Sequence, residues 1–126
     1  MMNLKDFFDD YEFHDSPLDD IFFDKQTEQL SLSIDLCLFN QKGYQQGGPE
    51  NQKGTLVFSQ VKKFIADPDI DIIDWKTQDG QILDARLDNK GMIVILFSVS
   101  NYSLKHENVY EIKCSAQKAT WRPSER

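Results

Sequence analysis

The sequence predicts a mainly β (α+β) fold, an antiparallel meander of about six or seven strands with one short N-terminal helix. Three observations predict it. Apolar and polar residues alternate along 28–39, an unbroken apolar run occupies 92–97, and segments rich in Gly, Asp and Asn separate the apolar stretches. The strands would form either a sandwich or one strongly curved sheet. With 126 residues, 40% of them hydrophobic, we expect a single domain, 1–126, with its own core.

A short helix is expected over residues 3–12. Apolar side chains recur there at the spacing of one helix face, namely Leu4, Phe7, Phe8 and Tyr11. Asn3 is suited to cap the helix and Asp6 to occupy its first turn. A helix this short does not persist in isolation, so its apolar face must pack on the sheet.

The first two strands are expected over 18–24 and 28–39, joined by a turn at 25–27. Pro17 ends the connection after the helix, because a proline forces the residue before it toward extended geometry. In the second strand, Leu and Ile alternate with Ser, Asp and Cys over five consecutive matches. One face of this strand is therefore core, and the polar face carries Cys37.

A polar loop, predicted to be flexible, follows over 40–54. It contains four of the six glycines and one aromatic residue, Tyr44. Strand character resumes over 55–64, where the apolar spacing changes between Phe58 and Val61. We interpret this change as a bulge in one strand.

The next segment is less determined. Residues 70–77 fit either a helical turn or a strand. Asp79-Gly80 is a two-residue hairpin signal, which would make 81–87 the second arm of a hairpin. The next turn is expected at 88–91.

The remaining residues predict two more strands. The unbroken apolar run is typical of a central, doubly buried strand, here 92–100. A loop over 101–108 would lead to the last strand, 109–119, which ends near Trp121. Residues 122–126 are expected to be a frayed tail.

The net negative charge of the chain is confined to its first 24 residues. That segment has eight carboxylates against one lysine, whereas the other 102 residues have 13 acidic and 13 basic side chains. A charge run is usually a solvated face, but aromatic residues interleave this one, as they do in docking surfaces. We therefore predict that a partner contacts Asp9, Asp10, Glu12, Asp19, Asp20 and, from the loop, Tyr44.

Composition excludes several classes of partner. A pI near 4.7 and scattered basic residues argue against nucleic acid, whose phosphates need clustered Lys and Arg. No apolar run reaches the ~18 residues of a membrane helix, and the start has no secretory-signal pattern, so we expect a cytoplasmic protein without membrane contact. Cys37 and Cys114 fall on opposite faces by parity and predict two free thiols. Without paired Cys or His motifs, no metal or cofactor is expected.

Two motifs have the residue types of functional sites. His14-Asp15-Ser16 contains the members of a hydrolytic triad, but neighbours on an extended chain point apart. We interpret the segment as a structural motif formed by Phe13, His14, Asp15, Ser16 and Leu18. The acidic segment 67–74 is similar to the start of a calcium loop, yet it lacks the required Gly and Glu and is interpreted as a solvated turn.

The stretch from Phe13 to Ile21 resembles the opening of a group of small bacterial proteins, which begin with aromatic-His-Asp-Ser-x-Leu-x-x-Ile and continue into a β-hairpin. The later Leu56-x-Phe58-x-x-Val61 also looks similar to that group. Most of its members are uncharacterised, and some are grouped with immunity proteins of polymorphic toxin systems. The resemblance implies no catalytic residue.

The expected function is that of a non-enzymatic, cytosolic protein-binding domain, such as an immunity protein that neutralises a basic toxin through an acidic surface. One alternative is a small hydrolase or ligand-binding protein with a cleft near His14 and Asp15, which needs both side chains in one pocket with a second titratable group. A third alternative is a homo-oligomer that associates through an exposed edge strand or through Cys37.

Overall fold

A computed structural model of the chain describes residues 2–76, 78–101 and 106–124, with the backbone alone described at positions 2, 72, 101 and 106. Within them the chain forms one antiparallel sheet of nine strands and one short α-helix, which confirms the mainly β fold. The sheet is open, with β1 (Met2–Asn3) at one edge and β5 (Lys63–Asp67) at the other. No helix among these residues is long and apolar enough to cross a membrane.

The strand order in the sheet is β1-β9-β4-β3-β2-β6-β7-β8-β5. The remaining strands are β2 (Pro17–Asp24), β3 (Gln29–Cys37), β4 (Asn51–Ser59), β6 (Asp79–Leu87), β7 (Ile93–Asn101), β8 (His106–Ser115) and β9 (Lys118–Pro123). The helical elements are α1 (Leu4–Asp10) and the 3-10 turns η1 (Leu38–Asn40) and η2 (Ile70–Ile72). Two three-strand meanders, β2-β3-β4 and β6-β7-β8, therefore make up most of the sheet.

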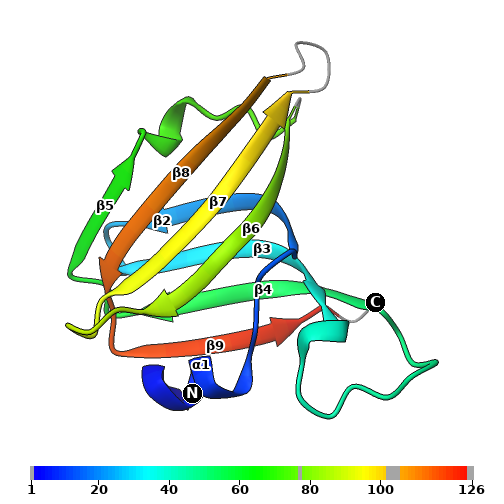
Figure 1. Ribbon diagram of the computed structural model, residues 1–126. Coiled ribbons are helices and arrows are strands. Elements are labelled where there is room, and N and C mark those ends of the chain that lie inside the picture. The colour runs from blue at the N-terminus through cyan, green and yellow to red at the C-terminus, as the bar shows by residue number, and fades with distance from the viewer. Residues whose placement is uncertain (1, 77, 102–105, 125–126) are drawn as a thin grey trace.

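The sheet folds over on itself, so that its two halves face each other (Figure 1). Strands β6, β7, β8 and β5 cross over β2, β3, β4 and β9. The core between them includes the alternating apolar side chains of β3 and those of β7, namely Leu30, Leu32, Ile34, Leu36, Ile93, Ile95, Phe97 and Val99. The two halves are joined by a short ladder in which Pro17 pairs with Gln81 and Leu18 with Gly80.

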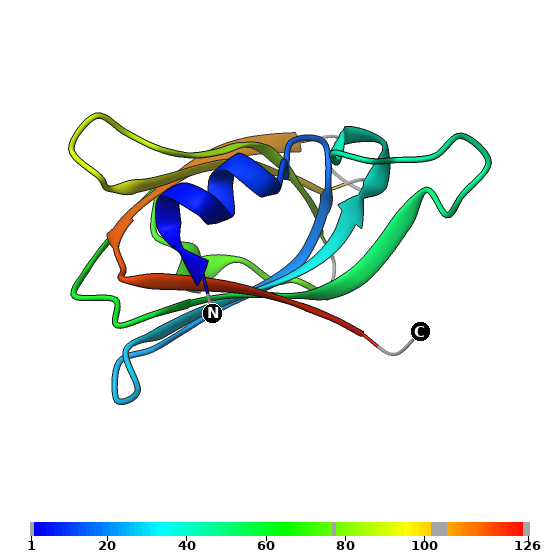
Figure 2. The same ribbon diagram turned by 90° about the horizontal axis from the view of Figure 1, so that it is seen from below.

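Helix α1 lies at one end of the space between the two halves (Figure 2). It is shorter than the predicted 3–12, but its cap is the predicted one, because the Asn3 side chain accepts a hydrogen bond from the Asp6 N–H at 3.0 Å. Phe7 is fully buried, with its ring stacked on Phe13 at 5.8 Å and edge-on to Phe58 at 6.5 Å. The helix thus packs its aromatic face on the sheet, as its apolar spacing predicts.

The predicted number of strands was too low because two predicted strands are each two, and because the two-residue β1 was not predicted. The strand expected over 55–64 ends at Ser59, and after a turn with Gln60 at φ 57° the chain continues as β5 on the opposite edge of the sheet. The strand expected over 109–119 divides into β8 and β9. The β4–β5 connection and the β8–β9 connection are hydrogen-bonded to each other. The Lys62 N–H donates to Ser115 O (3.2 Å), and the Gln117 N–H donates to Ser59 O (3.0 Å). The change in apolar spacing marked a change of layer, so the bulge interpretation was wrong.

The hairpin predicted at Asp79-Gly80 is also wrong, because both residues lie within β6 and pair with β7. A Cβ at Gly80 would lie 2.7 Å from the Leu18 carbonyl oxygen and 3.0 Å from the Trp75 ring. The glycine therefore serves a close approach of two strands. Ahead of it, the undecided segment 70–77 contains the 3-10 turn η2, and position 77 is outside the described residues.

The connections are shorter than predicted. The strand β4 begins at Asn51, which reduces the predicted 40–54 loop to 41–50 after η1. Arg122 and Pro123 pair with β4, and the Ser124 N–H donates to Lys53 O at 2.8 Å, so the expected fraying does not apply to them. The strands β7 and β8 take residues 101 and 106–108 from the predicted loop, and the described residues omit 102–105.

The predicted turn at 88–91 and the buried strand after it are present. The Asp88 carboxylate accepts hydrogen bonds from the N–H groups of Met92 and Lys90, which hold the pKa of that carboxyl below its ordinary value. Between Ile93 and Val99, every residue except Leu96 is buried. β7 is thus covered on both faces over most of its length.

Candidate functional site

The connection between α1 and β2 is held against β6 through its backbone. The Asp15 N–H donates to Ile82 O at 2.7 Å, and the Ile82 N–H donates to Ser16 O at 2.9 Å. Asp15 has φ 65°, a conformation that Asp adopts more readily than most residues. These bonds extend the short β2–β6 ladder, so the His14-Asp15-Ser16 segment lies where the two halves of the sheet join.

Ser16 ties the same connection to the end of β3. Its side chain is fully buried, and its Oγ accepts a hydrogen bond from the Cys37 N–H at 2.9 Å. Its own N–H donates to Phe13 O at 3.2 Å, which closes a tight turn. The hydroxyl therefore satisfies a backbone donor at a strand end.

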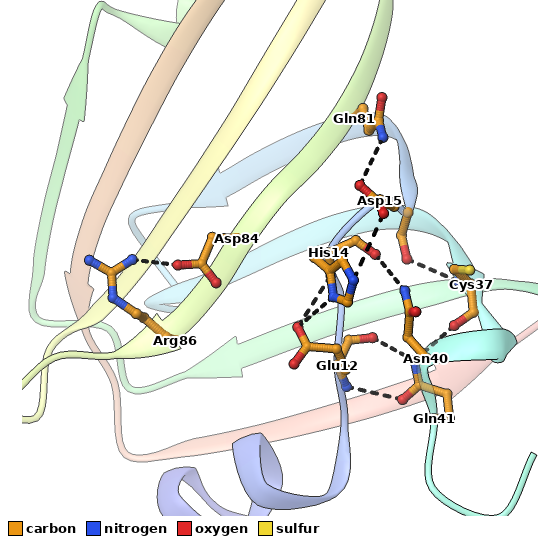
Figure 3. Close-up of polar contacts among 10 residues, drawn as sticks. Glu12, His14, Asp15, Cys37, Asn40, Gln41, Gln81, Asp84 and Arg86 are labelled. Carbon is orange, nitrogen blue, oxygen red and sulfur yellow. Dashed lines mark hydrogen bonds and ion pairs between the residues drawn. The ribbon is translucent and has the colours of Figure 1, made fainter.

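Two side chains that follow β3 clamp the connection from the other side (Figure 3). Asn40 Nδ2 donates to His14 O at 3.0 Å, and Gln41 Nε2 donates to the carbonyl oxygens of Glu12 and Cys37. The Glu12 N–H in turn donates to Gln41 Oε1 at 3.0 Å. These hydrogen bonds fix the connection between α1 and β2 to the residues that follow β3.

His14, Asp15 and Ser16 do not converge on one point. The His14 ring lies between two carboxylates, with Nδ1 3.1 Å from Glu12 Oε1 and Nε2 3.8 Å from Asp15 Oδ2. Its side chain is 42% exposed, whereas the Ser16 hydroxyl faces Cys37 inside the protein. The geometry is therefore not that of a triad.

We expect Ser16→Ala to lower the free energy of unfolding by about 1–3 kcal/mol, because it leaves the Cys37 N–H without its acceptor. Urea unfolding followed by tryptophan fluorescence measures the change. Ser33→Ala is the matched control, since Ser33 is a half-buried serine on β3, the strand that ends at Cys37. Equal losses in the two variants would contradict the role given to the Ser16 hydroxyl.

A pocket of about 360 Å³ opens beside this joint. It lies on the outer face of the sheet, because Ile82, Phe97 and Val99 alternate with its lining residues and are buried in the core. Among the residues that the structure describes, its lining contains three carboxylates and no basic side chain: Asp15, Pro17, Leu18, Asp19, Asp79, Gly80, Gln81, Ser98 and Ser100. The pocket combines negative charge with hydroxyl and amide groups.

The structure divides the predicted contact residues among several places. Asp19 lines the pocket, while Asp9 and Asp10 are exposed on α1 and Glu12 on the connection after it. The Asp20 carboxylate accepts a hydrogen bond from the Ile21 N–H at 2.8 Å. Tyr44 packs on Phe39 with ring centroids 4.9 Å apart, and its hydroxyl donates to Gly48 O at 3.4 Å. The pocket is lined by Asp15 but not by His14, so it does not hold the pair that a hydrolytic cleft would need.

Sequence reasoning missed the part of the pocket formed by β6 and β7. Asp79 and Gln81 were assigned to a hairpin, although they are neighbours of Asp15 in the fold. A usable signal was present at the end of the apolar run, where Ser98 and Ser100 alternate with the apolar residues Phe97 and Val99. Two hydroxyls at this spacing share one face of a strand.

The two cysteines and the acidic segment 67–74 do not form a further site among the described residues. Cys37 and Cys114 are both free, and burial raises the pKa of the Cys114 thiol to about 12, which keeps it neutral. In the segment 67–74, Asp69 caps η2 by accepting from the Asp71 N–H at 2.9 Å. Within the described ranges, no three His, Cys, Asp or Glu side chains are grouped as a metal ion would require.

No protein-family model, curated protein or solved structure matches this chain. The resemblance of the segment from Phe13 to Ile21 to small bacterial proteins, some grouped with immunity proteins, therefore stays a prediction.

Proposed function

We propose that this protein is a non-enzymatic, cytoplasmic binding domain whose acidic surface holds a basic protein partner, as an immunity protein would hold a basic toxin. One observation carries the proposal. Among the residues described, no Lys or Arg side chain pairs with any of the eight carboxylates between Asp6 and Asp24. Of the described cationic or titratable basic side chains, the half-exposed His14 ring alone lies against two of them.

Carboxylates without a basic neighbour contribute their full charge to the field around the protein. Elsewhere in the chain, acidic side chains are partly neutralised by local pairs, such as Glu28 with Lys62 at 2.8 Å and Asp84 with Arg86 at 2.7 Å. The N-terminal surface thus keeps a local excess of negative charge. Such a surface speeds the association of a basic partner and disfavours acidic ones.

The surface also has a rigid support. Asp9 and Asp10 project from a helix whose Phe7 is anchored in the core, and Glu12 lies on a connection fixed by Gln41. Charges held on a fixed frame lose little conformational freedom when a partner binds. This distinguishes the surface from a solubilising tail.

The test is capture of partners from a lysate of the organism that encodes the chain, at ~0.1 M and at ~1 M salt, where the Debye length is about 10 Å and 3 Å. We expect a basic protein to be retained at low salt and released at high salt. The variant Asp9→Asn/Asp10→Asn/Glu12→Gln should lose it, with an association rate at least roughly tenfold lower.

The control variant removes the same amount of charge from other exposed positions, as Glu50→Gln/Asp67→Asn/Asp71→Asn. It should retain the partner, because its charges lie outside the acidic segment. Retention by both variants, or capture of proteins without a basic excess, would refute the proposal. Sedimentation of the protein alone in the same buffers tests the alternative that it forms a homo-oligomer. The edge strand β5, with its 60% exposed Ile65, provides a surface for such association.

A further inference from the structure

We infer that the pocket at the β2–β6 joint is the subsite in which an arginine side chain of the basic partner inserts its guanidinium group. The inference deepens the proposed function and rests on it for the identity of the partner. It starts from two independent observations: the charge of the lining and a mostly buried serine whose hydroxyl group faces the pocket.

Among the described residues, every charged side chain of the lining is negative. Asp15, Asp19 and Asp79 contribute three carboxylates from two strands and a connection, and no described Lys, Arg or His side chain lines the pocket. A fourth carboxylate, that of Glu107, lies beside the pocket, where it accepts a hydrogen bond from Ser100 Oγ at 3.4 Å. The group that binds here must therefore be a cation.

Ser98 is the second observation. Its side chain lines the pocket from the middle of β7, yet the residue is only 5% exposed. No side-chain hydrogen bond of Ser98 to another described residue is found, and its hydroxyl oxygen is not one of the fully enclosed polar atoms. The hydroxyl is therefore accessible from the pocket, and a ligand N–H that reaches Ser98 Oγ would find a free acceptor.

The arrangement of the acceptors favours a guanidinium group over a metal ion. The carboxylates surround a space of about 360 Å³, and among the described residues they do not form a group that could ligate one ion. A guanidinium is planar, always charged, and has five N–H donors that point in several directions. It can therefore bond separate acceptors at once, including the Gln81 side chain, which already approaches Asp15 at 3.4 Å (Figure 3).

The pocket also has a surface for the aliphatic part of an arginine. Pro17 is exposed and contributes its ring to the lining at the place where β2 meets β6. The methylene stem of Arg packs on apolar surface while its charged end reaches polar groups. The nearby Arg86 of the protein itself lies farther along β6 and is paired with Asp84, as Figure 3 shows.

The test is an NMR titration of the whole isotope-labelled protein with Nα-acetyl-arginine amide. We expect weak, saturable binding with shifts confined to residues 15–19, 79–81 and 98–100. The uncharged isostere Nα-acetyl-citrulline amide should not bind. Nα-acetyl-lysine amide, whose ammonium group has three donors and no fork, should bind several-fold more weakly.

Variants separate the two observations. Asp19→Asn/Asp79→Asn should weaken arginine binding by roughly tenfold or more, since it removes two charge-assisted acceptors. Ser98→Ala should weaken it by about threefold to tenfold through the loss of one bond. Asp67→Asn/Asp71→Asn removes the same charge from outside the pocket and should bind as the unchanged protein does.

Equal binding of the arginine and citrulline probes, shifts spread along α1, or equal effects of the two double-Asn variants would overturn the inference. Calcium ions that displace arginine in a manner abolished by Asp19→Asn/Asp79→Asn would also overturn it, in favour of a metal. The two proposals fail separately. If Asp9→Asn/Asp10→Asn/Glu12→Gln loses the basic partner while Asp19→Asn/Asp79→Asn retains it, the proposed function stands and the proposed arginine subsite is wrong. If the arginine probe binds but no basic protein is captured, the subsite stands alone.

Discussion

Phe7→Ala is expected to lower the free energy of unfolding by about 3–5 kcal/mol, the usual cost of emptying a buried aromatic site. The Phe7 ring is fully buried and lies within 6.5 Å of the rings of Phe13 and Phe58. It is the single fully buried residue of α1, and a helix of seven residues does not persist without tertiary contacts. The variant should therefore release the helix as well as weaken the core.

Two measurements follow the change. Urea unfolding gives the loss of stability, and amide hydrogen exchange shows whether α1 opens separately from the sheet. Lys5→Ala serves as the control, because Lys5 lies on the exposed face of the same helix. Exchange in α1 that stays as slow in Phe7→Ala as in the unchanged protein would show that the helix does not depend on this ring.

Gly80→Ala should be the next most damaging change, with a loss of about 3 kcal/mol, the upper end of the usual cost of overpacking. The new Cβ would lie 2.7 Å from the Leu18 carbonyl oxygen, which is a backbone atom and cannot rotate away. Relieving this close contact requires β2 and β6 to separate. Their ladder, which joins the two halves of the sheet, has two register pairs. We expect faster hydrogen exchange at the Ile82 N–H, which donates to Ser16 O.

The comparison is with Gly43→Asn in the 41–50 loop. Gly43 has φ 77°, which Asn tolerates, and nothing lies within 4 Å of a Cβ placed there. This variant should lose less than about 1 kcal/mol. A Gly80→Ala protein as stable as Gly43→Asn would mean that the two strands can adjust to an added methyl group.

The sequence predicted the elements whose signal is local. The alternation from Leu30 to Leu36, the cap at Asn3 and the turn at Asp88 are each set by residues within one element, and each is present in the fold. Side-chain parity also placed Cys114 inside the protein. Such features depend on the pleat of a strand or the turn of a helix, and both are fixed by backbone geometry.

The predictions that were wrong concern features that depend on contacts between residues far apart in the sequence. Gly80 has the sequence context of a turn, and only the approach of Leu18 from another strand explains why glycine is needed there. The same holds for the break at Gln60, where the chain leaves one half of the sheet for the other. The pocket joins Asp15 and Asp19 to Asp79 and Ser98, which no pattern within a single strand could bring together.

The place of β9 in the sheet has a consequence for the growing chain. This strand lies between β1 and β4, although the ribosome makes it after all the others described here. Until residues 118–123 have left the exit tunnel, β4 has an unpaired edge of the kind that joins neighbouring nascent chains. Until then helix α1 also lacks part of the surface on which it packs. Phe13, which follows the helix, packs against Trp121 of β9 with ring centroids 6.3 Å apart.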